Sequence, residues 1–181
     1  MIVGTILTRI RDHLRGELAL PADQIEIRIH GHPPASAGPT FVALREQGVK
    51  SDGRSFLREE HHIEVALWRR LTDLPEDAAA AALYGDDPVQ PDAATLDELE
   101  RAVIRAVHGN ELAFVYALNQ TLGLGSAGAG GPGGPFQLPL YYTGRKGTEI
   151  VRQPGAPAST WAVRRLQFSG LNRVQSLDAL T

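Results

Sequence analysis

The sequence predicts an α+β fold, in which helices pack on one face of a mostly antiparallel sheet. Several segments carry apolar residues at every second position, which is typical of strands with one buried and one solvated face. Other segments carry apolar residues at every third or fourth position, which is typical of amphipathic helices. Strands and helices do not alternate along the chain, so a doubly wound parallel sheet is not expected. These observations together favour the α+β class.

The first 70 residues are expected to form one helix and three strands. A helix is predicted for residues 2–18, before Pro21, because apolar residues recur there every four positions: Ile2, Ile6, Ile10, Leu14 and Leu18. Strands are predicted for 24–30, 40–46 and 57–70. The alternating apolar residues of the first and third strands are Ile25, Ile27 and Ile29, and Ile63, Val65 and Leu67.

The middle of the chain is expected to leave the sheet and return as a capped helix. Residues 73–93 are rich in Ala, Asp and Pro and are interpreted as an excursion, with a short helix at 76–83. Thr95 and Glu98 match a capping box, which predicts a helix start. The predicted buried stripe of this helix is Leu96, Leu99, Val103, Ile104 and Val107.

The last part of the chain is expected to contain a further helix at 111–122, a glycine-rich loop and three strands. Residues 123–135 hold too many glycines for regular structure and are interpreted as a flexible connector. A phosphate-binding loop is not supported, because no Gly-Lys-Ser or Gly-Lys-Thr ends the stretch. Strands are predicted for 136–143, 148–152 and 161–169.

The last predicted strand shifts its apolar positions by one residue in the middle. Its apolar residues are Trp161, Val163, Leu166 and Phe168, with Arg164 and Gln167 between them. Core packing is the preferred interpretation for Trp68 and Trp161, and an anchor at an interface is the alternative.

Composition indicates one domain over residues 1–181, with 43% hydrophobic residues to build a core. The net charge of −3 does not suggest binding to nucleic acid over the whole surface. There is no cysteine, which excludes disulfides and thiolate metal sites. The N-terminal segment does not match a signal peptide, and no apolar run approaches the length of a membrane span. A soluble, intracellularly made protein is therefore expected.

Histidines provide the only candidate metal ligands that the sequence singles out. Four of the six form two close groups: His30, His32, His61 and His62. His-x-His can bind a transition metal, and three carboxylates lie near the second group: Glu59, Glu60 and Glu64. However, His61 and His62 would point to opposite faces of a strand, so only one of them could join a site. Solvated positions at strand ends are the preferred interpretation.

No catalytic motif is present. The chain lacks a Gly-x-Ser-x-Gly elbow. The carboxylate pair Asp86 and Asp87 suits a turn, and Asp97 with Glu98 suits a helix N-terminus. The sequence therefore predicts neither an enzyme nor a cofactor.

Basic residues gather in three places: Lys50, Arg54 and Arg58; Arg145, Lys146 and Arg152; Arg164 and Arg165. They lack interleaved aromatic residues, and the chain is acidic overall, so a rim of a protein–protein interface is preferred over a nucleic-acid site. The interface candidates are the loop 47–58 with its strand ends and the arginine pair: Lys50, Arg54, Arg58, Arg164 and Arg165.

The order of these elements resembles that of tail terminator, or tail completion, proteins of long-tailed phages and related tail-like particles. The resemblance rests on five segments: ILTRIRDHLRGEL, IEIRIHGHPP, REEHHIEVALWRR, TLDELERAVIRAVHG and a last strand W-x-V-R-R-L-x-F-x-G. It covers most of the chain apart from 73–93 and 123–135, where this chain is longer than many family members.

The resemblance implies a structural virion protein with helices on one side of a sheet. Family members form a ring, usually a hexamer, that caps the finished tail tube and offers a surface to the head–tail connector proteins. It implies no cofactor, no catalysis, no membrane and no sequence-specific nucleic acid. The implied partners are copies of the chain itself, the tail tube protein and the connector proteins, in a tail and neck assembled in the host cytoplasm. The alternatives are another neck protein, such as a connector or stopper, and a histidine-dependent metal-binding module.

Overall fold

A computed structural model describes residues 2–51, 58–72, 74–85, 93–108, 140–154 and 158–173. The helices in this part of the chain are α1 (Ile2–Glu17), the 3-10 turn η1 (Ala22–Gln24), α2 (Glu76–Tyr84) and α3 (Leu96–Val107). The strands are β1 (Ile25–Ile27), β2 (Thr40–Ser51), β3 (Arg58–Arg70), β4 (Tyr141–Arg145), β5 (Glu149–Gln153) and β6 (Ser159–Arg173).

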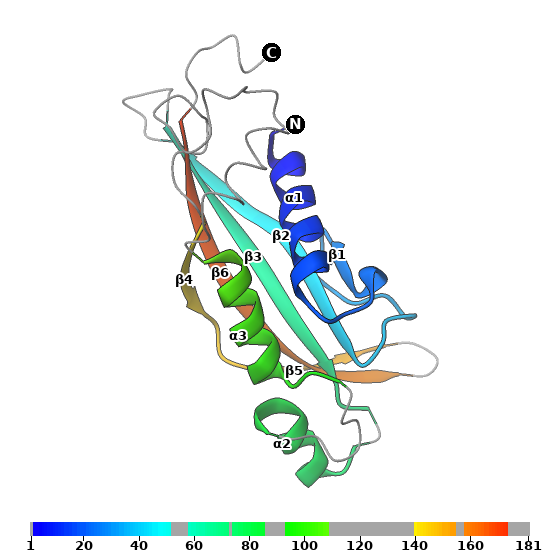
Figure 1. Cartoon of the computed structure of the whole chain (residues 1–181). Helices are drawn as coiled ribbons and strands as arrows, with labels where there is room; N and C mark the ends of the chain where they lie inside the picture. Colours follow the sequence, from blue (N-terminus) through cyan, green and yellow to red (C-terminus); the bar gives the residue numbers. More distant parts are fainter. Residues whose placement is uncertain are drawn as a thin grey trace.

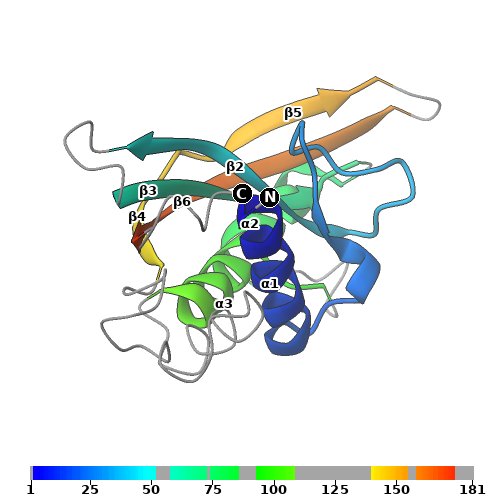
Figure 2. The same ribbon diagram turned by 90° about the horizontal axis from the view of Figure 1, so that it is seen from above.

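The six strands form one sheet with the order β1-β2-β3-β6-β4, and β5 also pairs with β6. Only the β1–β2 pair is parallel among the described strands, and the other pairs are antiparallel. Helices α1 and α3 lie side by side across one face, and α2 lies beyond the end of α3 (Figure 1). Seen from above, these helices lie on the same side of the strands (Figure 2). The predicted α+β class, with a mostly antiparallel sheet, is confirmed.

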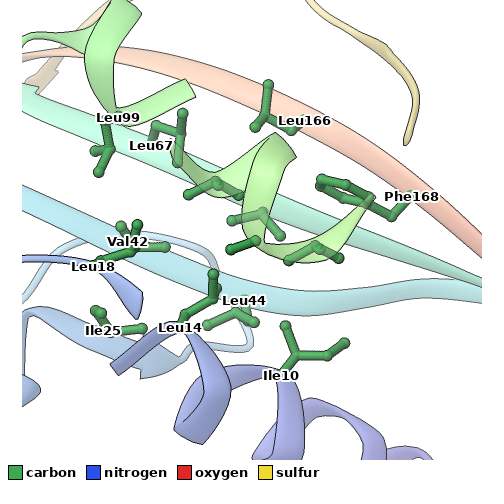
Figure 3. Packing of buried hydrophobic residues seen from close by; sticks show 14 of the residues in the cluster. Ile10, Leu14, Leu18, Ile25, Val42, Leu44, Leu67, Leu99, Leu166 and Phe168 are labelled. Atoms are coloured by element: carbon green, nitrogen blue, oxygen red, sulfur yellow. The ribbon is translucent and has the colours of Figure 1, made fainter. Parts of the chain in front are cut away.

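The main hydrophobic core fills the space between the helices and the sheet (Figure 3). Helix α1 contributes the side of its four-residue repeat that contains Ile10 and Leu14, and neither side chain is exposed to solvent. The strands contribute their alternate apolar residues to the same layer: Ile25, Val42, Leu44, Ile63, Val65, Leu67, Leu166 and Phe168. The helical and strand patterns of apolar residues therefore stabilise the fold mainly by burying this layer.

Helix α3 begins with the capping box that the sequence predicts. The backbone N–H of Glu98 donates to Thr95 Oγ1 at 3.3 Å, and the backbone N–H of Thr95 donates to Glu98 Oε2 at 2.9 Å. These bonds satisfy donors that a helix start leaves unpaired. The predicted stripe is buried except for Ile104, which is half-buried, and Ala106 is buried in addition.

Two strands in the first half differ in length from the prediction. Strand β1 ends at Ile27, so the placement of Ile29 in a strand is wrong, and 86% of Ile29 is exposed. The chain turns here through Gly31, which has a φ of 67°. Strand β2 continues to Ser51, where the sequence predicts a loop from Gly48 onward. A bulge at Gln47, between Glu46 and Gly48, bends the strand without ending the ladder, and Gly48 pairs with His62.

Two glycine-to-alanine changes should affect stability in opposite directions. Gly31→Ala is expected to lower the free energy of unfolding by about 1 kcal/mol, because a side chain is disfavoured in the left-handed region. Gly16→Ala is the matched control, since a Cβ at this helical position meets nothing within 4 Å. It should raise the free energy of unfolding by about 0.5–1 kcal/mol. Chemical denaturation of both variants measures the difference, and an equal effect of the two changes would contradict this prediction.

The second half of the sheet has one long strand and a divided edge. Strand β6 is longer than predicted at both ends, while β5 differs from its prediction by one residue at each end. Strands β4 and β5 pair with successive parts of β6, and the N–H of Lys146 between them donates to the carbonyl of Arg165 at 3.0 Å. They therefore form one interrupted edge. The described chain resumes at residue 140, and β4 runs over Tyr141–Arg145 instead of ending at 143.

Several predicted elements lie outside the described residues. These are the helix at 111–122, the loop at 123–135 and most of the excursion after α2. The short helix predicted within the excursion is present as α2. None of the described helices combines the length and the hydropathy that a membrane span requires.

Candidate functional site

The face of the sheet opposite the helices, called the open face here, is not uniformly polar. At one end it carries a second apolar cluster: Ala37, Phe41, Ala43, Ala66, Trp68, Trp161 and Val163. Trp68 and Trp161 are fully buried, with ring centroids 6.4 Å apart and an interplanar angle of 84°. The core interpretation of both tryptophans is confirmed, and the expectation of a wet face is wrong at this end.

The shift of apolar positions in β6 reflects a change in which face of the strand carries the apolar residues. The β3–β6 register has no irregularity, so the strand continues without a bulge. Trp161 and Val163 pack in the open-face cluster, whereas Leu166 and Phe168 pack under the helices. Ala162, between Trp161 and Val163, packs in the helix-side core, so β6 is buried on both faces at this end.

The proline-rich segment 31–39 is held against the open-face cluster by hydrogen bonds at its far end. Arg70 Nη2 donates to the carbonyl of Ala37 at 2.6 Å, and the N–H of Gly38 donates to Gln24 Oε1 at 2.6 Å. The Arg70 guanidinium also lies 4.8 Å from the centroid of a Trp161 ring. Such a cation–π contact is favourable in addition to the area it buries.

His32, in the same segment, packs on Trp68 with ring centroids 5.4 Å apart. Its pKa is lowered from the usual value, first by partial burial of the ring and then by the positive charges of Arg165, His30 and Arg45. A lowered pKa means that the unfolded chain binds the proton more readily. The contribution of His32 to stability is therefore present above a pH of about 6.5 and is lost as the pH falls through the folded-state pKa.

We expect His32 to titrate below a pKa of about 6.5 in an NMR pH titration of the folded protein. Arg165→Gln should raise this pKa, because Arg165 has the largest effect among the neighbouring positive charges. Arg105→Gln is the matched control, since Arg105 is exposed on α3 and is not among the causes of the shift. An unchanged His32 pKa in Arg165→Gln would contradict the prediction.

The middle of the open face holds a buried carboxylate. Glu64 is fully buried, and its oxygens accept hydrogen bonds from Arg45 Nε at 2.7 Å, from Gln167 Nε2 at 3.1 Å and from Gln47 Nε2. Arg165 Nε lies 3.7 Å from the same carboxylate, and Arg165 also pairs with Glu149. These long side chains cover Glu64 and satisfy its hydrogen-bonding oxygens. The charges of Arg45 and Arg165 balance those of Glu64 and Glu149, so the network forms a rigid surface without net charge.

The two adjacent arginines, Arg164 and Arg165, are separated by the sheet. Arg165 lies on the open face, whereas Arg164 points under α3 and is 1% exposed. Arg164 Nη1 lies 2.6 Å from Asp97 Oδ1 and 2.5 Å from Glu100 Oε2. Burial by itself lowers the pKa of Arg164, but the hydrogen bonds to these carboxylates raise it above the ordinary value. Its selection as a surface candidate is corrected: Arg164 is buried and joins α3 to the sheet within the chain.

Two of the other interface candidates lie in described strands, Lys50 near the end of β2 and Arg58 at the start of β3. Lys50 is exposed and stands opposite Glu60 in the ladder. Arg54 lies outside the described residues. Arg58 is the first residue of β3, and its side chain also lies outside them.

The four candidate histidines do not share one site. His30 is exposed beyond β1, and His32 packs on Trp68. His61 and His62 lie on opposite faces of β3, as the alternation requires, and each has a glutamate nearby: Glu46 for His61 and Glu60 for His62. Within the described parts of the chain, no group of three or more His, Cys, Asp or Glu residues is arranged to hold a metal ion.

The two edges of the sheet carry exposed features that the sequence reasoning did not connect. Four large hydrophobic residues are markedly exposed among those described: Ile29, Tyr84, Tyr141 and Ile150. Tyr141 and Ile150 lie on the β4–β5 edge, and Ile29 lies just beyond β1 at the other edge. The sequence shows these residues only as part of an alternating pattern, and such a pattern does not distinguish an edge strand from a central one.

No protein-family model matches this chain, and no curated protein matches it. The fold and surfaces define an α+β protein with helices on one face of the sheet. Its open face carries an ion-pair network and an apolar cluster, and its two sheet edges differ.

Proposed function

We propose that this chain is a structural subunit of a long-tailed phage or a tail-like particle, namely the tail terminator. In this role, copies of the chain form a ring that caps the tail tube and joins it to the head–tail connector proteins in the neck. The partners are the chain itself, the tail tube protein and the connector proteins. The protein resides in the virion after assembly in the host cytoplasm.

The observation that carries the proposal is the one-sided architecture of the sheet. The resemblance implies a small α+β subunit with helices on one side, and α1 and α3 lie on one face of a mostly antiparallel sheet. On the opposite face, Glu64 is hydrogen-bonded to Arg45 and Gln167, and the segment 31–39 covers Trp68 and Trp161. A subunit that works by its shape benefits from such a rigid surface, because little ordering is needed when it docks.

The two unlike edges of the sheet also support the proposal. A ring requires each subunit to present two different surfaces that fit one another, because identical patches meeting each other produce a closed dimer. The β1 side of the sheet is short and lies beside α1, whereas the β4–β5 side is a long interrupted edge. The chain therefore has two distinct surfaces available for neighbours on opposite sides.

Deletion of the gene from the particle that encodes it tests the proposal. Without a terminator, tail tubes should grow to uncontrolled lengths and should lack heads in electron micrographs, and the intact gene in trans should restore normal particles. Tails of normal length attached to heads would overturn the proposal. Tails of normal length without heads would also overturn it and would favour a connector or stopper. Stoichiometric zinc in the purified protein, lost in His30→Ala/His32→Ala, would favour the metal-binding module instead.

A further inference from the structure

We infer that copies of this chain associate head to tail through the two edges of the sheet, with the β4–β5 edge of one copy against the α1–β1 edge of the next. This inference rests on the ring in the proposed function and names the surfaces that would close it. The partner is a second copy of this chain. The argument uses unpaired charges, exposed apolar side chains and the register of the sheet.

Unpaired charges of opposite sign lie on the two edges. On the β4–β5 edge, Lys146 and Arg152 are exposed, and neither forms an ion pair within the described residues. On the α1–β1 edge, Glu17 and Asp23 are exposed and are likewise unpaired there. The neighbouring charges already form ion pairs. On the β4–β5 edge, Arg145 pairs with Glu100 and Glu149 with Arg165. On the α1–β1 edge, Glu26 pairs with Arg28, and Asp12 with Arg11 and Arg15. The charges left for a partner are therefore basic on one edge and acidic on the other.

Exposed apolar side chains accompany these charges. Ile150 is 60% exposed and Tyr141 is 43% exposed on the β4–β5 edge. Ile29 is 86% exposed just beyond β1. Three of the four markedly exposed large hydrophobic residues in the described chain thus lie on the two edges, and only Tyr84 lies elsewhere. Apolar anchors beside charged residues are the usual composition of a protein–protein interface.

The register places the two edges at the same level of the sheet. Glu26 of β1 pairs with Ala43, Ala43 with Ala66, and Ala66 with Arg165. The carbonyl of Arg165 accepts the hydrogen bond from Lys146 between β4 and β5. One row therefore crosses the whole sheet and ends beside the acidic edge on one side and the basic edge on the other. A copy placed next along this row brings its acidic edge to the basic edge of the first.

The charges disfavour the symmetric alternative. An isologous dimer through either edge would place like charges opposite each other, Lys146 and Arg152 against themselves or Glu17 and Asp23 against themselves. A head-to-tail contact pairs unlike charges at every junction. Repetition of such a contact closes into a ring when the rotation between neighbours divides a full turn.

Charge reversal with mixing tests this inference on the purified full-length chain. Lys146→Glu/Arg152→Glu makes both edges acidic, and Glu17→Lys/Asp23→Lys makes both edges basic. Each variant alone is expected to lose the multimer and sediment as a single chain, whereas an equimolar mixture should regain the multimer. The matched control is Arg101→Glu/Arg105→Glu, which reverses two exposed charges on α3, away from both edges, and should keep the wild-type mass. Unchanged multimers in the edge variants, or a mixture that stays monomeric, would overturn the inference.

Cysteine cross-linking provides an independent measurement, because the chain has no cysteine of its own. Under mild oxidation, the Asp23→Cys/Arg152→Cys double variant should form a ladder of linked multimers on a denaturing gel, and each single variant should not pass the dimer. A double variant that gives no more than the single variants, or a wild-type chain that is monomeric at high concentration, would overturn the inference. The result is separable from the deletion experiment: overlong tails with no ladder leave the terminator function and remove the edge contact, and a ladder with normal tails does the reverse.

Discussion

Replacing Arg164 with Met is expected to lower the free energy of unfolding by about 3 kcal/mol, at the lower end of the range for breaking a buried ion pair. Arg164 is 1% exposed, and its guanidinium lies within 2.6 Å of carboxylate oxygens on Asp97 and Glu100. Its removal leaves both carboxylates beside an apolar side chain. The loss stays near the lower end because the Asp97 side chain is 39% exposed and regains water. Urea denaturation followed by circular dichroism measures the effect.

The matched control for this prediction is Arg145→Met. Arg145 Nη1 lies 2.8 Å from the same Glu100 carboxylate, but the Arg145 side chain is 47% exposed. An exposed ion pair of this kind contributes only about 0–1 kcal/mol. Both variants remove a guanidinium from Glu100, but Arg164 is buried and also pairs with Asp97, whereas Arg145 is half exposed and, among the described residues, pairs with Glu100 only. Equal losses in both would show that the burial of Arg164 does not determine its contribution.

Replacing Trp68 with Ala is expected to lower the free energy of unfolding by about 3–5 kcal/mol, the usual cost of truncating a buried aromatic residue. Trp68 is fully buried and contacts Trp161 edge-on and the His32 ring. The change leaves a cavity beneath the segment that joins β1 to β2, so the position of the β1 edge should also loosen. Hydrogen exchange of Gly38, whose N–H is bonded to Gln24, should become faster than in the wild type.

Two controls separate this effect from a general loss of aromatic area. Trp68→Phe should cost clearly less, because a ring remains in the cluster. Tyr84→Ala removes a ring that is 61% exposed and should change stability by no more than about 0.5 kcal/mol. A Trp68→Ala variant as stable as Tyr84→Ala would contradict the placement of Trp68 in a second core.

Local patterns in the sequence were sufficient to predict most elements. The four-residue repeat of Ile10 and Leu14 predicted α1, the Thr95–Glu98 capping box predicted the start of α3, and period-two alternation predicted β3. These signals depend on neighbours within one or two turns or one strand, so they are visible in a short window. The same reasoning misplaced the end of β1 and of β2, because a strand's length depends on the partner that pairs with it.

The candidate surfaces depended on contacts between distant parts of the chain. Arg164 and Arg165 are neighbours in sequence, yet one is buried beneath α3 and the other joins the network around Glu64. Nothing local distinguishes them, since a strand with an apolar cluster on each face exposes neither side completely. The alternation in β6 appeared as a slip for the same reason.

The sequence by itself determined the fold class and the identity of most helices and strands, because short-range periodicity sets which face of each element is apolar. Only the tertiary structure decided which charges are paired within the chain and which remain exposed at the sheet edges. That division depends on the packing of α3 on the sheet, which brings Asp97 to Arg164, and on strand order and register, which place Lys146 across the sheet from Glu26. Long-range pairing of this kind leaves no trace in the spacing of neighbouring residues.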